Sequence, residues 1–324
     1  MCGTKKTFLV IICGPTASGK TALAADIAEK FGGEVINADS MQIYGGINIA
    51  SAIPNEAERR GIPHHLFGII EPERAFSVAQ WLVIARESVG EISSRGSLPV
   101  VVGGTGLYIT SLADNIVFDN VGGAWDFRGE MKRLADERGN AFLLEKLRET
   151  DPEAASKLHE NNVKRVIRAL ETHRLSGKSM NARRDESKSV PSPYEICIIG
   201  IDFEDRKTLY DRINRRVDAM VSGGLVGEAR AFYSRKNIPT ASQTIGHKEF
   251  FPFFDGNSTL DECIENLKKR TRNYAKRQLT WFRRNKKIQW LIMKDETDYD
   301  KILKDAVRII DDRRNAVSGG KGQA

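Results

Sequence analysis

Residues 14–21 read Gly14-Pro15-Thr16-Ala17-Ser18-Gly19-Lys20-Thr21, which fits the phosphate-binding pattern G-x-x-x-x-G-K-[ST] at each defined position. The apolar run 8–13 before it is typical of a buried strand, and the alanine-rich segment 21–31 after it predicts a helix. The glycines let backbone N–H groups turn toward an anion, Lys20 adds a positive charge, and the Thr21 hydroxyl is the expected Mg²⁺ ligand. A strand, this loop and a helix predict a site for a diphosphate or triphosphate. The alternative is a chance glycine-rich turn.

The bulk composition describes a globular chain. With 324 residues and 40% hydrophobic content, the chain can bury a core for one large domain or two of moderate size. The apolar run 8–13 is too short for a secretion signal, and we expect no membrane partner because no stretch is long enough to span a bilayer. The cysteines lack metal-ligand spacing, which favours neither zinc nor disulfides and suits a reducing cytoplasm. They are Cys2, Cys13, Cys197 and Cys263.

Positive charge is concentrated near the C-terminus. The segment 268–287 contains ten Lys or Arg and no Asp or Glu, so the rest of a chain whose net charge is +7 is net negative. Such a segment favours a polyanionic partner, with a solvated helix face as the alternative. It also mixes cations with Trp281 and Phe282, which would either stack on exposed bases or anchor the helix in the core. The cations expected on one face are Lys269, Arg272, Lys276 and Arg283.

Three further strand-like runs lead to residues of types that bind ligands or take part in catalysis. Residues 33–38 lead to Asp39, 98–102 lead to a Gly-Gly-Thr-Gly turn, and 196–201 lead to Asp202. Because ligands gather at the carboxyl ends of parallel strands, these points should converge on the phosphate loop. We therefore expect an α/β core over 1–117 and 191–311 that includes C-terminal basic helices, a helical insertion over 118–190, and a disordered tail over 312–324.

Asp39 and the turn around Thr105 are the strongest candidates for chemistry. A carboxylate beside a phosphate loop holds Mg²⁺ through water, accepts a proton from a nucleophile, or simply caps the local backbone, and the sequence leaves these roles open. Thr105 offers a hydroxyl within a turn whose glycines permit close backbone approach, although a turn without ligand contact would use the same residues.

Two pairs of basic residues need an interpretation. Arg212 and Arg216 lie one helical turn apart and would clamp a diphosphate, with an ion pair to Asp211 or Asp218 as the alternative. His64 and His65 are adjacent and have no third ligand nearby, so we interpret them as hydrogen-bonded structural histidines rather than metal ligands.

The ordered motifs together resemble the tRNA dimethylallyltransferase family over roughly residues 8–290. The resemblance implies a P-loop, nucleotide-kinase-like α/β core with a parallel sheet and a helical insertion domain, and it implies Mg²⁺. It also implies transfer of a dimethylallyl group from dimethylallyl diphosphate to N6 of the adenosine immediately 3′ of the anticodon, position 37, in tRNAs that read codons beginning with U. The matching motifs are 14–21, Asp39-Ser40-Met41-Gln42-Ile43-Tyr44, Pro63-His64-His65-Leu66, 102–108, 165–171 and 276–284.

The resemblance also assigns roles to individual residues. Asp39 would be the general base at the adenine amine, Thr105 its neighbour at the same nitrogen, and the phosphate loop the holder of the diphosphate. The anticodon stem-loop of tRNA would lie against Asp39 and Thr105 themselves and against residues along the chain. These are Ser40, Met41, Gln42, Arg128, Lys164, Arg165, Val166, Ile167, Arg168, Gln243, Thr244, Ile245, Gly246, His247 and Lys248, joined by Lys276, Arg277, Trp281 and Arg283 of the basic segment.

The chain departs from the family pattern at three places. Residues 48–53 read Asn-Ile-Ala-Ser-Ala-Ile where the family usually reads Asp-Ile-Gly-Thr-Ala-Lys, Gly68 replaces a usual aspartate, and His247 replaces a usual tyrosine. These changes bear on the shape of the substrate site. Two other functions fit the phosphate loop, namely a small-molecule or nucleotide kinase and a nucleotide-dependent RNA-binding switch. In each case we expect a monomer.

Overall fold

A computed structural model describes residues 6–118, 125–177, 190–235 and 240–319, together with 179 and 238. The chain forms two compact units, one from residues 1–113 and 193–324 and the other from 114–192. The predicted insertion 118–190 falls within the second unit.

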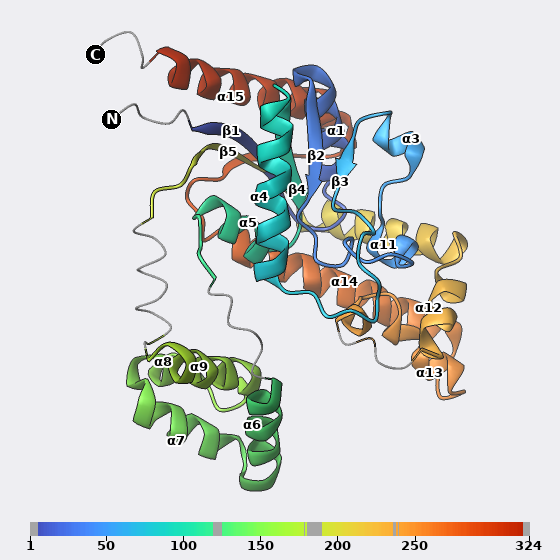
Figure 1. The fold of residues 1–324 in the computed structure, drawn as a ribbon. Helices are drawn as coiled ribbons and strands as arrows, with labels where there is room; N and C mark the ends of the chain where they lie inside the picture. Colours follow the sequence, from blue (N-terminus) through green and yellow to red (C-terminus); the bar gives the residue numbers. More distant parts are fainter. Residues whose placement is uncertain are drawn as a thin grey trace. The chain divides into compact units, whose positions relative to one another are not determined.

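The larger unit is built on a six-stranded sheet in the order β3-β2-β4-β1-β5-β6, and all its paired strands are parallel (Figure 1). The central strand β1 pairs with β4 and β5, placing Val10 opposite Val100 and Cys197. The α/β fold class predicted from the sequence is confirmed, although β3 and β6 were not anticipated. The strands are β1 (Thr7–Cys13), β2 (Gly33–Asn37), β3 (His64–His65), β4 (Leu98–Gly103), β5 (Tyr194–Phe203) and β6 (Gln289–Met293).

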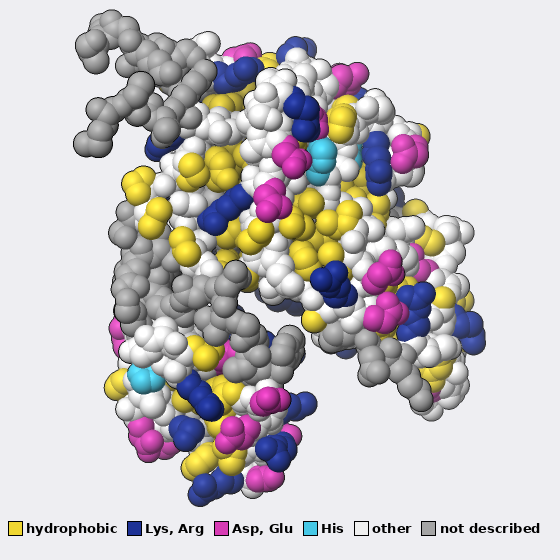
Figure 2. Space-filling model, in the orientation of Figure 1, with side chains coloured by type: hydrophobic (Ala, Val, Ile, Leu, Met, Phe, Trp, Pro, Cys, Tyr) yellow, Lys and Arg dark blue, Asp and Glu magenta, His cyan; other side chains and the backbone are white. Residues whose placement is uncertain are grey.

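Helices cover both faces of the sheet (Figure 1). On one face α1 (Lys20–Phe31) packs against α15 (Tyr299–Gly319), and on the other α4 (Val78–Ser94) packs against α5 (Gly106–Ala113). The inner strands are buried on both faces, as doubly covered parallel sheets require. In the same orientation, Figure 2 shows hydrophobic side chains gathered over α4 and the segment after β3.

The remaining helices of this unit lie at the carboxyl edge of the sheet. The long helix α14 (Leu260–Phe282) packs against α11 (Arg206–Ser222), and a separate core cluster joins α11, α12 (Leu225–Tyr233) and α14 around Phe250. Three short helices, α2 (Asn48–Ser51), α3 (Glu56–Arg59) and α13 (Phe251–Phe254), complete the unit.

The expected disordered tail over 312–324 is wrong for its first residues, because α15 continues to Gly319. Ile310 is fully buried, Arg313 pairs with Glu195 of β5, and the Arg314 guanidinium lies 5.6 Å from the ring centre of Phe31. These contacts explain why a charged sequence stays helical, since tertiary partners compensate for weak local preference. Residues 320–324 lie outside the described part of the chain.

In its described residues the smaller unit has four helices with their own apolar core, which includes Leu143, Leu147, Val166 and Ile167. The buried carboxylate of Glu171 pairs with the guanidinium groups of Arg128 and Arg168 at 2.9 and 2.5 Å. The expected tRNA contacts Val166 and Ile167 therefore have side chains committed to this core, whereas Lys164 and Arg165 are exposed. The helices are α6 (Trp125–Arg138), α7 (Asn140–Thr150), α8 (Pro152–Ser156) and α9 (Val163–Ser176).

Candidate active site

The phosphate loop turns between β1 and α1 in a backbone shape that requires glycine. Gly14 has φ +153°, and a Cβ there would lie 2.6 Å from the carbonyl oxygen of Ile201. Gly19 has φ +87° and caps the N-terminus of α1, where backbone N–H groups face an incoming anion. The hydroxyl of Ser18 is buried there and has no hydrogen-bond partner among the described residues. A phosphate oxygen would satisfy such a group.

Two cations and one carboxylate surround the loop. Burial, followed by the nearby charge of Arg216, lowers the pKa of Lys20 to about 8, although Asp39 acts in the opposite direction. Burial likewise lowers the pKa of Arg216, against the effect of Asp39, and a guanidinium remains charged throughout the working pH range. Two desolvated cations facing one carboxylate leave an excess of positive charge. The site is therefore suited to a polyanionic ligand.

Arg212 braces the loop from outside. Its Nε donates to the carbonyl oxygen of Ala17 at 2.9 Å, and its guanidinium pairs with Glu296 at 2.5 Å. Arg212 thus forms an ion pair, but with Glu296 rather than with Asp211 or Asp218 as the alternative had it. Glu296 is far from Arg212 in the sequence, so local spacing could not indicate it. Direct contact between Arg212 and a diphosphate stays a prediction.

Asp39 follows β2 and is held in place by its neighbours. Its backbone N–H donates to Asn37 Oδ1 at 2.7 Å, and its Oδ1 accepts from the backbone N–H of Met41 at 3.0 Å. Its Oδ2 faces the turn after β4 and would lie 3.3 Å from a Cβ at Gly104. One carboxylate oxygen thus caps the backbone, as one alternative had it, while the other points toward Gly104.

Thr105 meets Asp39 because the ends of β2 and β4 approach closely. A Cβ at Gly103 would lie only 2.2 Å from the carbonyl of Ala38, which explains the glycine. The Thr105 Oγ1 accepts from the backbone N–H of Ser40 at 2.9 Å and donates to Ser40 Oγ at 3.2 Å. The convergence of strand ends predicted from the sequence thus brings Asp39, Ser40 and Thr105 together.

Two functional candidates were missed, Tyr274 and Gln278 of α14. Burial, followed by the charge of Asp39, raises the pKa of Tyr274, so its hydroxyl stays protonated. Gln278 is only 5% exposed and contacts both the phosphate loop and the Gly104 carbonyl. The available signal was a buried-face tyrosine followed one turn later by a glutamine.

A cavity of about 210 Å³ is lined by several of these groups, among them Thr16, Asp39 and Tyr274. Lys20, Thr21, Asp39 and Arg216 are among its polar lining residues, and apolar side chains also line it. The apolar lining includes Val217, Met220, Leu225 and Leu267. The cavity therefore offers positive charge for an anion and an apolar surface for a hydrocarbon group.

A cationic groove of about 580 Å³ adjoins this cavity and shares Gln243, Ile245 and Tyr274 with it. Four cationic side chains line this groove: Lys248, Lys269, Arg270 and Arg277. This combination suits a phosphodiester chain that delivers one base to the cavity.

The other expected RNA-facing residues of α14 and its C-terminal end divide into two groups. Lys276 and Arg277 are exposed, whereas Arg272 donates to Asn214 at 2.7 Å and Arg283 pairs with Asp202 at 2.8 Å. Phe282 is buried and anchors the helix. Trp281 is 38% exposed, with its indole N–H donating to Thr110 at 3.2 Å. The single cationic face expected from the spacing is thus interrupted by internal pairs.

Two segments expected to contact tRNA, 41–42 and 243–246, line the cavity that contains Asp39. The Gln42 side-chain amide donates to the carbonyls of Ser51 and Ala52 at 3.0 and 2.9 Å, and the Thr244 hydroxyl donates to Met41 Sδ at 3.2 Å. Gly246 also lines the cavity.

Two of the three departures from the family pattern meet at one carboxylate, that of Glu228. It accepts from the backbone N–H groups of Ile49 and Ala50 at 2.8 and 3.0 Å, and its Oε1 lies 2.8 Å from His247 Nε2. Burial raises the pKa of Glu228, but these hydrogen bonds outweigh it and hold the pKa below its usual value. The third departure, Gly68, has φ +64°, a backbone conformation that favours glycine.

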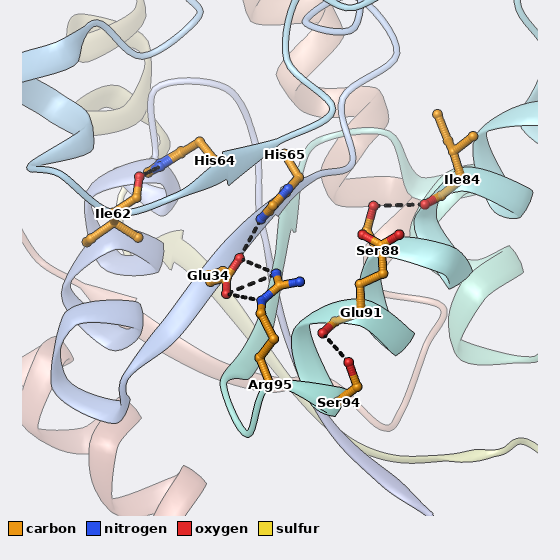
Figure 3. Close-up of polar contacts among 9 residues, drawn as sticks. All are labelled: Glu34, Ile62, His64, His65, Ile84, Ser88, Glu91, Ser94 and Arg95. Carbon is orange, nitrogen blue, oxygen red and sulfur yellow. Dashed lines mark hydrogen bonds and ion pairs between the residues drawn. The ribbon is translucent and has the colours of Figure 1, made fainter.

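The paired histidines serve the scaffold (Figure 3). His65 Nε2 lies 2.7 Å from Glu34, which also pairs with Arg95 at 2.9 Å, and His64 Nδ1 lies 2.8 Å from the Ile62 carbonyl oxygen. Across the described residues, no three His, Cys, Asp or Glu side chains gather as a metal site. The hydrogen bonds expected of the two histidines are therefore present.

The parallel sheet, the phosphate loop and the cavity define a P-loop α/β protein that handles a phosphorylated ligand. Residues 42–285 match the family model described as IPP transferase, and the chain belongs to this family of tRNA dimethylallyltransferases. It is 46% identical to the tRNA dimethylallyltransferase of Acetivibrio thermocellus over 91% of this chain and 95% of that protein.

Two solved structures are similar along the whole chain. The tRNA isopentenylpyrophosphate transferase of Bacillus halodurans is 41% identical, with a TM-score of 0.73 over 97% of this chain and 99% of that one. A eukaryotic dimethylallyltransferase acting on tRNA is 28% identical, with a TM-score of 0.80 over 97% of this chain and 80% of that one. Among the described helices, none combines the length and the apolar character that crossing a bilayer requires.

Proposed function

We propose that this protein transfers a dimethylallyl group from dimethylallyl diphosphate to N6 of adenosine 37 in tRNAs that read codons beginning with U. The observation that carries the proposal is the single cavity in which Lys20, Arg216 and the phosphate loop face Asp39. Charge for a diphosphate and a carboxylate for a nucleophile thus lie at one site. Membership of the family supports the same reaction.

The proposed step is a substitution at the allylic carbon C1. The N6 lone pair forms the new bond to C1, the bond between C1 and the diphosphate oxygen breaks, and the diphosphate leaves with the electron pair. N6 loses one proton, which Asp39 accepts. Because the amine lone pair is delocalised into the adenine ring, a positioned base favours the reaction. Thr105 and the protonated Tyr274, close to Asp39, would orient the amine.

The leaving group is stabilised by fixed positive charge. Lys20, Arg216 and the loop amides face the charge that develops on the diphosphate, in a cavity that limits water. The unpartnered Ser18 hydroxyl and the loop geometry also fit a diphosphate with a bound Mg²⁺, for which Thr21 is the expected protein ligand. A bound Mg²⁺ would supply Lewis-acid stabilisation of the same oxygens.

The tRNA would present its anticodon stem-loop to the cationic groove. Lys269, Arg270 and Arg277 would contact phosphates, and the target base would swing into the adjoining cavity at a modest unstacking cost. The protein would act in the cytoplasm as a monomer.

Three parallel incubations test the proposal. The protein is incubated with Mg²⁺ and unmodified tRNA, once with labelled dimethylallyl diphosphate, once with labelled ATP and once without either. We expect label from the prenyl donor to enter tRNA at position 37, as mapped by mass spectrometry. Label moving from ATP to a small molecule would instead indicate a kinase, and binding without transfer would indicate an RNA-binding switch.

A further inference from the structure

Gln278 is a polar residue on the buried face of α14 that the reaction described above does not use. It is 5% exposed, and its neighbours Ala275 and Leu279 on the same face are buried and apolar. A buried amide is costly unless both its ends are hydrogen-bonded. The partners of Gln278 therefore indicate what its presence secures.

The two ends of the Gln278 amide contact two different loops. Its Oε1 accepts from the backbone N–H of Thr16 in the phosphate loop at 2.8 Å, and its Nε2 donates to the carbonyl of Gly104 at 3.0 Å. An oxygen facing an N–H group and an NH₂ facing a carbonyl is the one amide orientation that satisfies both contacts. The Gln278 side chain therefore joins the phosphate loop to the turn that carries Thr105.

The fit around this bridge is tight. A Cβ at Gly104 would lie 2.2 Å from Gln278 Nε2, so the residue after Gly103 must be small for the bridge to form. One helical turn before Gln278, Tyr274 lines the cavity beside Asp39. Hydrogen bonds of Gln278 thus connect Thr16 to Gly104, the residue before Thr105.

We propose that Gln278 is a positioning residue that fixes the separation between the diphosphate-binding loop and the acceptor side of the cavity. This inference rests on the proposed transfer. Substitution requires N6 and C1 to be aligned at about 3–3.5 Å, and a misplacement of about 1 Å costs about 100-fold in rate. The Thr16 amide is held by Gln278, so the loop is shaped before a diphosphate arrives.

The test uses Gln278→Met, which is similar in size but cannot bridge, and Thr280→Ala on the exposed face of the same helix as the matched control. We expect kcat of Gln278→Met to fall about 100-fold, while KM for the stem-loop RNA changes less than about threefold. Amide hydrogen exchange at Thr16 should become faster in the ligand-free protein, with the rest of β1 still protected. Thr280→Ala should match the wild type in each measurement.

A folded Gln278→Met protein with kcat near the wild-type value would overturn the inference. So would unchanged Thr16 exchange, or a loss of protection spread over the whole sheet, since either would make Gln278 a general packing residue. If Gln278→Met does not fold, Gln278→Asn keeps the amide but is too short to bridge both loops, and the same outcomes apply. If the wild type transfers no dimethylallyl group, the proposed function fails, while Thr16 exchange still tests the bridge.

Discussion

The lowered pKa of Lys20 predicts that catalytic efficiency with dimethylallyl diphosphate falls at alkaline pH. Burial and the charge of Arg216 lower the pKa of Lys20 to about 8, and the protonated form is the one that attracts a diphosphate. Loss of the proton above this pH removes one of the two buried cations. The effect should appear in kcat/KM for dimethylallyl diphosphate, because this ratio reports ionisations of the free enzyme.

The size of the effect follows from the pKa. With a pKa of about 8, about nine tenths of the Lys20 side chains are charged at pH 7 and about one tenth at pH 9. We therefore expect kcat/KM to fall about tenfold between these pH values. Phosphate groups of the donor are already ionised at about pH 7 and above, so the donor does not contribute a limb of its own.

The assay is initial-rate transfer to a stem-loop RNA at subsaturating donor from pH 7 to 9.5, at constant ionic strength. Lys20→Arg keeps the charge at all these pH values, so whatever activity it retains should show no alkaline limb. Lys30→Gln removes an exposed lysine from the same helix and should keep the wild-type profile. A flat wild-type profile up to pH 9.5, or the same limb in Lys20→Arg, would refute the assignment to Lys20.

Three further substitutions test other parts of the site. Asp39→Ala should lower transfer by about 100-fold or more because it removes the base, with stem-loop affinity largely kept in a filter-binding assay. Lys269→Gln combined with Arg277→Gln should reduce the slope of log affinity against log salt by about 1.5, because two phosphate contacts are lost. Glu228→Gln should cost about 1–3 kcal/mol in the free energy of unfolding by denaturant at neutral pH, since it weakens the hydrogen bonds of a buried carboxylate with His247 and two backbone amides.

Each of these has a contrary result. Near-normal turnover in Asp39→Ala would show that Asp39 is not the base. An unchanged salt slope would show that Lys269 and Arg277 are solvated and do not contact phosphates. Because the folded-state pKa of Glu228 is depressed, its stabilising effect is present at neutral pH and is lost on acidification. The stability difference between Glu228→Gln and wild type should therefore shrink as the pH falls, and a difference that grows would contradict the assignment.

The sequence predicted the parts of the site that depend on local pattern. The phosphate loop has fixed spacing, and Asp39 and Thr105 follow apolar runs whose parallel arrangement forces their ends together. The role of Gln278 could not be predicted, because its partner Thr16 lies 262 residues away and nothing local distinguishes a bridging glutamine from a solvated one. The same holds for Glu228, which joins residues 49 and 50 to His247 only after folding.

Charge patterns were informative about location and less so about use. The density of cations in 268–287 correctly indicated the helix that lines a cationic groove. Helical spacing alone could not show that Arg272 and Arg283 are occupied by Asn214 and Asp202, since these partners come from other elements.

The contact between Gly103 and Ala38 has a consequence for inhibitor design. Because the carbonyl of Ala38 fills the space that a side chain at residue 103 would need, and because Ala38 also accepts from the Thr105 N–H at 3.2 Å, Asp39 and Thr105 are carried on a stiff frame. A rigid compound that links a diphosphate mimic to a purine at a fixed spacing would lose little entropy on binding to such a frame. Flexible linkers between the two parts should bind more weakly to this protein than rigid ones of matched length.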